Sequence, residues 1–395
     1  MHLIIFDDKR YKAFYPASQL RSVGDIRCGI LKLRQRLTFE LGFDEAAIIV
    51  RPGLVSLYRF RQPDWRINDN PEGTKLYVNS RLKIDDTLIE QIKGIKEEEA
   101  LVTEGGIVAI LTKEDLDFGF DFGGFTQRQI DALLYRSMVD IVHDNGRLIT
   151  RDFENIFYEE ENFFETEPGV HVLHPYNVWI GENVKLAPNV VLDASEGPIV
   201  IDEDASVMAN AVIVGPAYIG KGSLVKIGAK IYGGSSIGPV CKVGGEIEGS
   251  IFQAYSNKQH DGFLGHSYVG EWVNLGADTN NSDLKNTYKN VRQYSYETGE
   301  MVDSGTQFMG CLIADHVKIG INCSLNTGLV VGLGANIYGN KLFSGFVPDF
   351  SWGEADSLNT YRIDEFLDTT GKVKSRRKLE LQQIESELLK LFHGE

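Results

Sequence analysis

Two histidines and a few basic side chains are the residues of this chain whose types and spacing could do chemistry. His260 and His266 lie in the segment HDGFLGHSYVGEWVNLGAD, residues 260–278. An imidazole with its ordinary pKa of ~6.5 is largely neutral at physiological pH, so either side chain could accept a proton from a substrate. The positively charged residues near this segment are Lys258, Lys285 and Arg292. These residue types indicate proton transfer beside a surface that attracts an anion.

The composition narrows the class of protein. Among 395 residues, Lys+Arg 40 against Asp+Glu 56 give a formal net charge of -16, which argues against a nucleic-acid binder that neutralises phosphates with surplus cations. No apolar stretch approaches the length of a membrane span, and the N-terminus resembles no export signal. The cysteines are scattered without a C-x-x-C spacing, as is typical of reduced thiols. We therefore expect a cytoplasmic protein that contacts neither membrane nor nucleic acid.

A six-residue repeat dominates residues 180–343. The clearest run of aliphatic residues at every sixth position is Ile201, Val207, Ile213, Ile219, Val225, Ile231, Ile237 and Val243. A helix with 3.6 residues per turn does not generate this spacing, whereas a parallel β-helix with one short strand per hexad does. With three strands per turn, successive coils stack at about 4.8 Å. Interruptions of the register at residues 194–198 and 278–308 predict loops thrown out of this solenoid.

The regions on either side of the repeat have a different pattern. Strand-like runs at residues 3–6, 46–50 and 107–111 alternate with helical stretches at 24–42 and 126–144, which indicates an α/β domain. Near the C-terminus, residues 376–392 place apolar side chains on one face of a helix, which we expect to pack on the solenoid. The predicted domains are an α/β domain at 1–165, a β-helix at 166–350 and a helical tail at 351–395.

The repeat and the histidine segment together resemble a known family. The hexads are similar to the left-handed β-helix of acyltransferases. The segment at 260–278 fits, without a gap, the form H-x-x-Y-x-G-x-x-x-(I/V)-G-x-x-V-N-x-G-A-G-T of the bifunctional UDP-N-acetylglucosamine pyrophosphorylase/glucosamine-1-phosphate N-acetyltransferases. This resemblance implies a left-handed hand for the β-helix, a homotrimer, and acetyl transfer from acetyl-CoA to an amino-sugar 1-phosphate, glucosamine 1-phosphate first of all, in nucleotide-sugar and cell-envelope precursor synthesis.

The same resemblance implies roles for single residues. His260 matches the family's catalytic base, and the backbone N–H of Ala277 would stabilise the oxyanion of the acyl-transfer intermediate. Asn274 matches a residue that holds the sugar amine or acetyl group, and Lys289 matches a lysine near the sugar phosphate. Ser304, in VDSGTQF, matches a segment that contacts acetyl-CoA.

Three departures from the family pattern bear on the substrate. Phe263 replaces a tyrosine, Asp278 replaces a glycine, and Asp283 replaces an asparagine that contacts the sugar. Phe263 also falls on the hexad register, where a core position is expected. We keep Phe263 and Asp283, with Lys258 and Lys285, as candidate substrate-binding residues. His266 matches no family histidine and is expected at the surface or beside the site.

The N-terminal region lacks the glycine-rich loop with which sugar nucleotidyltransferases usually begin. It resembles instead an alternate bacterial branch of the family, with an opening strand, P-x-x-x-x-R and then D-(I/L)-R-x-G-I-L, here from Pro16 to Gly29. Arg21 and Arg27 are candidate ligands of a nucleotide or sugar phosphate, although surface arginines beside a helix start have the same pattern. An active domain would transfer uridylyl from UTP with Mg²⁺, and its aspartates are unassigned.

Other interpretations stay open at this point. The chain could acylate another sugar nucleotide, or it could be a non-catalytic trimeric scaffold that binds a sugar nucleotide. Some left-handed β-helices, the γ-class carbonic anhydrases, bind zinc through three histidines across a trimer interface. Here His260 and His266 lie six residues apart and His316 is remote, so a metal site is not assigned. The combination of His260, Asn274 and a lysine-bearing excursion favours an enzyme.

Overall fold

The computed structural model describes residues 1–160, 162 and 168–394, in two compact units. The first unit contains Met1–Ile26, Leu31–Ser137 and the chain from Gln382 onward, and the second contains Arg27–Ile30 and the described residues from Met138 to Leu381. The predicted boundary between 165 and 166 falls outside the described residues, so the domain limits stay a prediction. Among the described helices, none is long and apolar enough to cross a membrane.

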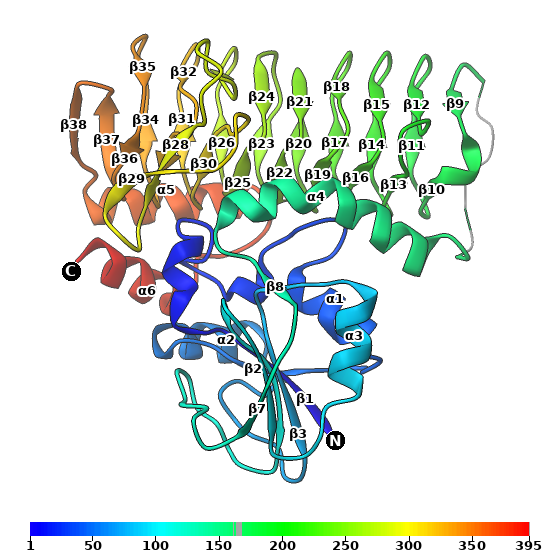
Figure 1. The fold of residues 1–395 in the computed structure, drawn as a ribbon. Helices are drawn as coiled ribbons and strands as arrows, with labels where there is room; N and C mark the ends of the chain where they lie inside the picture. Colours follow the sequence, from blue (N-terminus) through cyan, green and yellow to red (C-terminus); the bar gives the residue numbers. More distant parts are fainter. Residues whose placement is uncertain (161, 163–167, 395) are drawn as a thin grey trace. The chain divides into compact units, whose positions relative to one another are not determined.

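The first unit is built on a six-stranded mixed sheet (Figure 1). In sheet order the strands are β2 (Ala47–Ile49), β1 (His2–Phe6), β3 (Lys75–Asn79), β6 (Gly106–Thr112), β5 (Glu99–Thr103) and β7 (Thr126–Gln129). Strands β2, β1 and β3 are parallel, β6 runs against β3 and β5, and β7 is parallel to β5. The carboxyl ends of β1, β3 and β5 therefore meet at one edge of the sheet.

Helices and short segments complete this unit. They are η1 (Lys9–Phe14), η2 (Val23–Asp25), α1 (Leu33–Glu40), η3 (Pro52–Leu54), α2 (Val55–Arg61), α3 (Asp86–Lys93), α6 (Gln383–His393) and the paired strands β4 (Leu82–Lys83) and β8 (Leu133–Leu134). Asp85 caps α3 by accepting from Leu88 N at 2.8 Å, and α3 buries Leu88, Ile89 and Ile92. The helix predicted at 24–42 is wrong over its first part, because α1 begins only at Leu33.

The helix predicted at 126–144 is also shorter than expected. Its first residues form β7, which pairs with β5, and the helix α4 (Met138–Asp152) begins twelve positions later in the second unit. Pairing with a sheet edge satisfies the backbone of β7, so tertiary context overrides the local helical pattern.

The second unit is a parallel β-helix with three faces (Figure 1). The first face contains β10 (Val178–Ile180), β13 (Ile199–Ile201), β16 (Ala217–Ile219), β19 (Ser235–Ile237), β22 (Ile251–Ala254), β25 (Tyr268–Glu271), β30 (Leu312–Ile313), β33 (Val330–Val331) and β36 (Phe346–Val347). The second face contains β11 (Lys185–Leu186), β14 (Ser206–Val207), β17 (Leu224–Val225), β20 (Lys242–Val243), β23 (Asn257–Lys258), β26 (Asn274–Leu275), β31 (Lys318–Ile319), β34 (Asn336–Ile337), β37 (Ser351–Glu354) and β38 (Ser357–Thr360).

The third face is made of two consecutive sheets. They contain β9 (His171–Leu173), β12 (Val191–Asp193), β15 (Val212–Val214), β18 (Lys230–Ile231), β21 (Glu246–Glu248) and β24 (Phe263–Gly265), and then β27 (Asn280–Asn281), β32 (Ser324–Leu325) and β35 (Leu342–Phe343). Between β27 and β30 the chain leaves the coil and forms a hairpin of β28 (Arg292–Ser295) and β29 (Glu300–Asp303). This excursion was predicted as a loop.

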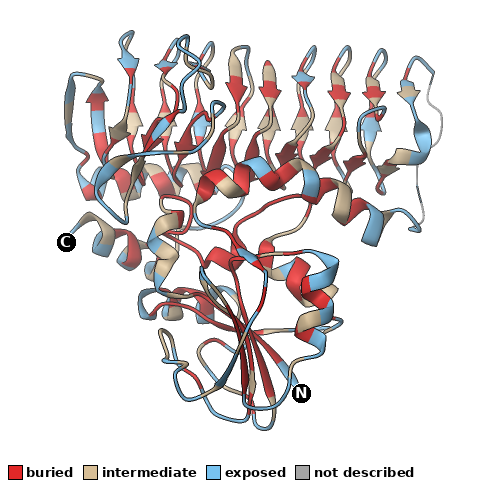
Figure 2. Ribbon diagram, in the orientation of Figure 1, coloured by how far each residue is buried: buried red, intermediate tan, exposed pale blue. Residues whose placement is uncertain are grey.

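The hexad residues form the core of the β-helix, as the sequence predicted. All eight aliphatic residues from Ile201 to Val243 are buried, and red, buried positions recur along the strands of the β-helix in Figure 2. Corner residues such as Asn183, Asn189 and Asn210 adopt positive φ angles, which asparagine and glycine tolerate best. The predicted fold class, an α/β domain with a hexapeptide β-helix and a C-terminal helix, is confirmed.

Helices α4 and α5 (Ile363–Ser375) belong to the β-helix unit. Helix α4 packs on the first face, where Ile149 joins a buried cluster with Val200 and Tyr218, and Asn145 Nδ2 donates to Gly234 O at 2.7 Å. The C-terminal helix α6, expected on the solenoid, is grouped instead with the first unit, where Glu385 pairs with Arg61 on α2 at 2.6 Å. The remaining short helices of the second unit are η4 (Phe153–Phe157) and η5 (Pro175–Asn177).

Candidate functional site

His260 lies at the corner of the β-helix between the second and third faces, directly after β23. Its side chain is exposed, and among the described residues its ring has no hydrogen-bond partner. The backbone oxygen of His260 accepts from Lys258 Nζ at 3.0 Å, which fixes the loop without engaging the imidazole. The imidazole is therefore free to exchange a proton with a bound molecule.

Lys258 faces inward and does not reach an open surface. The residue is 1% exposed, and its ammonium donates to the backbone oxygens of Gly244 and His260 at 3.2 and 3.0 Å. Burial lowers the pKa of Lys258 to about 8, although nearby Asp261 and Asp278 act in the opposite direction. In this structure Lys258 supports the His260 corner and makes no surface available to a substrate.

Ala277 occupies the same corner as His260, one coil further along. The strand register pairs Asn257 with Asn274, and Asp278 N donates to Asp261 O at 3.1 Å, so the two corners stack directly. Neighbouring coils are about 4.8 Å apart. Ala277 O accepts from Asn322 N at 2.8 Å, while the N–H of Ala277 has no acceptor among the described residues. An exposed imidazole and an unpaired amide thus lie side by side.

Phe263 and Asp283 meet on the third face, next to this corner. A Cβ atom on Gly265 would lie 2.2 Å from Asp283 Oδ2 and 2.6 Å from Phe263 Cζ, so only glycine leaves room for both side chains. Phe263 was expected in the core, but Leu264 takes the core position at 1% exposed, and Phe263 is half-buried. Because side chains alternate along a strand, Phe263 is directed to the outer side.

His266 forms an ion-pair geometry with Asp283 that the sequence did not predict. His266 Nδ1 lies 2.8 Å from Asp283 Oδ2, and the two side chains are 22% and 14% exposed. The ring of His266 lies against His143 of α4, with centroids 5.9 Å apart, and against Phe308, at 5.4 Å. His143 Nε2 is 2.8 Å from Phe308 O, and burial lowers the pKa of His143. The sequence contained no signal for this cluster, because its members come from three separate segments.

The excursion after β27 carries the remaining predicted residues. Lys285 Nζ donates to Asn290 O at 2.8 Å, and Lys289 is exposed. Ser304 Oγ donates to Thr306 O at 3.1 Å and accepts from Thr306 N at 3.3 Å, so its hydroxyl is engaged in a local turn. Tyr294 stacks on Phe346 of β36 with ring centroids 3.9 Å apart, which fixes the hairpin to the first face. Lys289 is therefore the predicted lysine with an available charge.

The two arginines predicted to bind phosphate are buried. Arg21 is 4% exposed and donates to Ala17 O at 2.6 Å. Arg27, at 6% exposed, lies in the second unit, where its guanidinium is 5.2 Å from the ring centroid of Tyr218 and its backbone N donates to Gln253 Oε1 at 2.9 Å. Arg21 belongs to the first unit and Arg27 to the second.

The first unit has a cavity of about 470 Å³ at the edge where β1 and β3 end. Asp7 and Asp8 follow β1, Arg81 follows β3, and Gly105 and Gly106 form the turn between β5 and β6. Ligands of open sheets with parallel strands commonly bind at such carboxyl ends. Two adjacent aspartates directly after the first strand, Asp7 and Asp8, are the sequence signal for this cavity.

The two aspartates of this cavity differ in environment. Asp8 Oδ2 accepts from Arg81 Nε at 2.9 Å and from Asn79 Nδ2 at 3.0 Å. Asp7 is 1% exposed and accepts from the hydroxyls of Ser80 and Ser22 at 2.7 and 2.9 Å. Burial raises the pKa of Asp7 to about 6 in spite of these hydrogen bonds.

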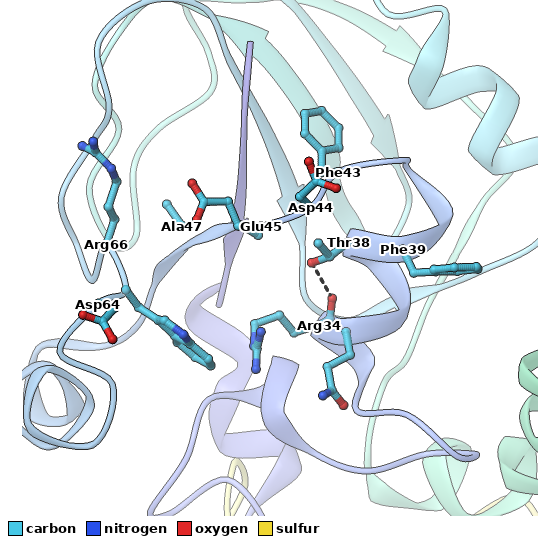
Figure 3. A pocket seen from close by; sticks show the side chains of 12 residues that line it. Arg34, Thr38, Phe39, Phe43, Asp44, Glu45, Ala47, Asp64 and Arg66 are labelled. Carbon is cyan, nitrogen blue, oxygen red and sulfur yellow. Dashed lines mark hydrogen bonds between the residues drawn. The ribbon is translucent and has the colours of Figure 1, made fainter. Parts of the chain in front are cut away.

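A second cavity of the first unit, about 400 Å³ in volume, lies beside α1 (Figure 3). The guanidinium of Arg34 lies 4.0 Å from the ring centroid of Trp65 and pairs with Asp25 Oδ1 at 3.1 Å. Figure 3 also shows the hydroxyl of Thr38 bonded to the carbonyl oxygen of Arg34, at 3.0 Å. The lining carries charges of both signs and contains no predicted site residue.

Several known proteins are similar to parts of this chain. A family model described as sugar nucleotidyl transferase matches residues 3–160. The "Bifunctional protein GlmU" of Synechococcus elongatus is 26% identical over 252 residues, covering 58% of this chain and 51% of the relative. The "Bifunctional sugar-1-phosphate nucleotidylyltransferase/acetyltransferase" of Sulfurisphaera tokodaii is 31% identical over 198 residues, covering 45% of each chain. The chain thus spans about half the length of the curated relatives it matches.

Solved structures were compared as well. A putative acetyltransferase of Bacillus cereus aligns with 16% identity and a TM-score of 0.30, over 53% of this chain and 99% of the other. The UDP-N-acetylglucosamine acyltransferase of Campylobacter jejuni aligns with 12% identity and a TM-score of 0.31, over 56% of this chain and 94% of the other.

Proposed function

We propose, starting from the similarity of this chain to bifunctional sugar-phosphate nucleotidyltransferase/acetyltransferases, that its β-helix transfers the acetyl group of acetyl-CoA to the amine of an amino-sugar 1-phosphate, in nucleotide-sugar synthesis. Glucosamine 1-phosphate is the substrate we expect first. The observation that carries the proposal is the corner where the exposed, unpaired imidazole of His260 stacks beside the unpaired N–H of Ala277 on the next coil.

This corner supplies the two groups that acyl transfer needs. The sugar amine is largely an ammonium ion near neutral pH, so His260 removes a proton before the nitrogen attacks the thioester carbon. The new N–C bond forms as the N–H of Ala277 donates to the oxyanion, and the C–S bond then breaks. The attacking nitrogen releases its second proton to water, and coenzyme A leaves as the thiol when the proton taken up by His260 passes to its sulfur.

The third face next to the corner offers groups for the sugar. Asp283 and Phe263 meet over Gly265, and Lys289 is exposed on the excursion. In our proposal the Asp283 carboxylate, held by His266, binds the positively charged amine, and Lys289 binds the sugar phosphate.

Replacement of the proposed base tests this function. His260→Ala should lower kcat for acetyl transfer by about a hundredfold to ten-thousandfold, the usual contribution of a positioned general base, with little change in melting temperature. His171→Ala, an exposed histidine on β9 of the same β-helix, is the matched control and should leave kcat unchanged. Free thiol release from acetyl-CoA is the measurement. Equal kcat for His260→Ala and the wild type would refute the assignment.

The family match over residues 3–160 favours a second activity in the first unit, uridylyl transfer from UTP to the sugar phosphate. The cavity at the carboxyl ends of β1 and β3 is the place we propose, with Lys9, Arg10 and Arg81 to meet phosphate. The described residues contain no group of three His, Cys, Asp or Glu side chains placed to hold a metal ion. Pyrophosphate release with UTP, measured separately from thiol release, tests this activity.

We also propose that the protein works in the cytoplasm as a homotrimer. Along the corner that carries His260 and Ala277 lie the exposed apolar side chains Ile227, Ile321 and Tyr338. Apolar side chains gathered along one edge are typical of a surface that another chain covers. Ile321→Glu should therefore reduce the mass measured by sedimentation, and a wild type that sediments as a monomer at micromolar concentration contradicts the proposal.

A further inference from the structure

A cavity of about 290 Å³ on the second face of the β-helix has an unusual set of charges. It lies between the strands β20, β23, β26 and β31 and the C-terminal end of α5. The cations in its lining are Lys242, Lys318, Arg376 and Arg377. No carboxylate lines this cavity, although the chain as a whole has a formal net charge of -16.

The strand register explains how the cations come together. Lys242, Asn257, Asn274 and Lys318 are paired in that order on four successive strands, so their side chains form a ladder with steps of about 4.8 Å. Arg377 joins the ladder from the segment after α5, where its Nη2 donates to Asn257 Oδ1 at 2.9 Å. The cavity therefore combines charged and amide donors on one rigid surface.

In the part of the chain that the structure describes, no carboxylate pairs with Lys242, Lys318, Arg376 or Arg377. Lys318 Nζ donates to two neutral carbonyl oxygens, of Trp272 at 2.6 Å and of His316 at 3.0 Å, and loss of hydration lowers the pKa of Lys318 to about 7. Burial and then the charges of Arg377 and Arg376 lower the pKa of Lys242. Cations that disfavour one another's charge in this way are stabilised by an anion placed among them.

An aromatic wall closes one side of the cavity. The rings of Tyr255 and Trp272, both in the lining, are stacked with centroids 4.5 Å apart and an interplanar angle of 10°. Lys374, on α5, lies 5.6 Å from the ring centroid of Trp272 and adds a further cation behind the wall. Glu271 is near Tyr255 but does not line the cavity.

We infer that this cavity binds a phosphate monoester group of one of the two substrates, through Lys242, Arg376 and Arg377. Arginine and lysine are the usual partners of phosphate, and the amides of Asn257 and Asn274 supply further donors. The inference rests on the proposed function only for the source of the phosphate, which is either the 3′-phosphate of coenzyme A or the 1-phosphate of the sugar. Binding itself does not depend on turnover.

Calorimetric titration of the full-length protein tests the inference without any reaction. The probes are adenosine 3′,5′-bisphosphate, glucosamine 1-phosphate and inorganic phosphate, each titrated at low salt. We expect Lys242→Gln and Arg376→Gln each to raise the Kd of the bound probe about tenfold, the effect of one charge-assisted hydrogen bond. Lys185→Gln is the matched control, because Lys185 is an exposed lysine on β11 of the same face, three coils away, and it should leave Kd unchanged.

The outcomes separate the source of the phosphate and the two proposals. If the variants lose more affinity for adenosine 3′,5′-bisphosphate, the cavity binds the 3′-phosphate of coenzyme A. If they lose more affinity for glucosamine 1-phosphate, it binds the phosphate of the sugar. The inference is overturned if the wild type binds none of the probes at millimolar concentration, or if Lys242→Gln and Arg376→Gln bind like Lys185→Gln. If the protein transfers acetyl groups but the cavity variants bind the probes normally, the proposed function stands and the phosphate site is refuted. If the cavity variants bind the probes weakly but the protein transfers no acetyl group, the phosphate site stands and the proposed function is refuted.

Discussion

Asp7, buried at the end of β1, makes the stability of the first unit depend on pH in a predictable direction. Its carboxyl has a pKa raised to about 6 by burial, against 3.8 for an exposed aspartate. The folded protein therefore binds this proton more tightly than the unfolded chain does. Between pH ~4 and ~6 the folded state carries more of the proton, so the free energy of unfolding falls as the pH rises through this window and is level above it.

The magnitude follows from the difference between the two pKa values. A difference of about 2 pKa units corresponds to ~3 kcal/mol, since one unit is ~1.4 kcal/mol. Asp7→Asn removes the titration and keeps an oxygen that accepts from Ser22 and Ser80, so the decline between pH 4 and pH 7 should shrink by up to ~3 kcal/mol. At pH 7 the substitution removes a buried charge and should raise the free energy of unfolding. The loss of charge-assisted hydrogen bonds reduces this increase by ~1 kcal/mol for each bond.

Urea unfolding curves at several pH values between 4.5 and 7.5, followed through the tyrosines and tryptophans, measure this effect. Asp44→Asn, an exposed aspartate of the same unit, is the control and should reproduce the pH dependence of the wild type. If Asp7→Asn lowers the free energy of unfolding equally at every pH, the hydrogen bonds of the carboxylate contribute more to stability than its burial costs. An unchanged pH dependence in Asp7→Asn would refute the raised pKa.

Two further predictions concern the β-helix. Gly310→Ala would place a Cβ atom 2.0 Å from Gly265 O, so we expect a loss of about 1–3 kcal/mol in thermal unfolding, whereas Gly371→Ala, with no atom within 4 Å of its Cβ, should stabilise helix α5 by ~0.5–1 kcal/mol. Equal effects of the two alanines would contradict the close approach at Gly310. Asp283→Asn should raise KM for glucosamine 1-phosphate about tenfold and leave KM for acetyl-CoA nearly unchanged, since only the sugar carries the amine. A parallel rise in both constants would show that Asp283 acts on the fold alone.

The β-helix was predictable because every hexad contains its own core residue, so each repeat can be recognised from local sequence alone. Ile213 points into the core whatever its neighbours do, and a miss at one place leaves the period readable elsewhere. The six-residue spacing predicted a core position at Phe263, and this prediction was wrong. Leu264 takes the core position, and the half-buried ring of Phe263 lies on the outer side. Local periodicity cannot decide between two adjacent apolar residues, because packing against the neighbouring coil makes the choice.

The proposed catalytic corner was predictable only in part. His260 and Ala277 were identified through a motif, and their stacking follows from coil length once the β-helix is known. The contact of His266 with Asp283 was not predictable, because it depends on how the excursion returns to the coil and on α4, which supplies His143. Arg21 was expected to reach phosphate, yet it is buried and donates to Ala17 O, since pattern matching carries no information on burial.

The way the excursion rejoins the β-helix gives that segment a modular character. Met309 N donates to Asp283 O at 2.8 Å, Leu284 is bridged to Phe308, and Gly310 N donates to His266 O at 2.9 Å. The two ends of the excursion are thus hydrogen-bonded to each other, and the next coil of the β-helix stacks on the previous one without a gap. We therefore expect the coils to tolerate changes of length between these two points, provided that the stacking of Tyr294 on Phe346 is kept. The excursion can therefore differ in length or sequence while the path of the chain through the corner with His260 stays the same.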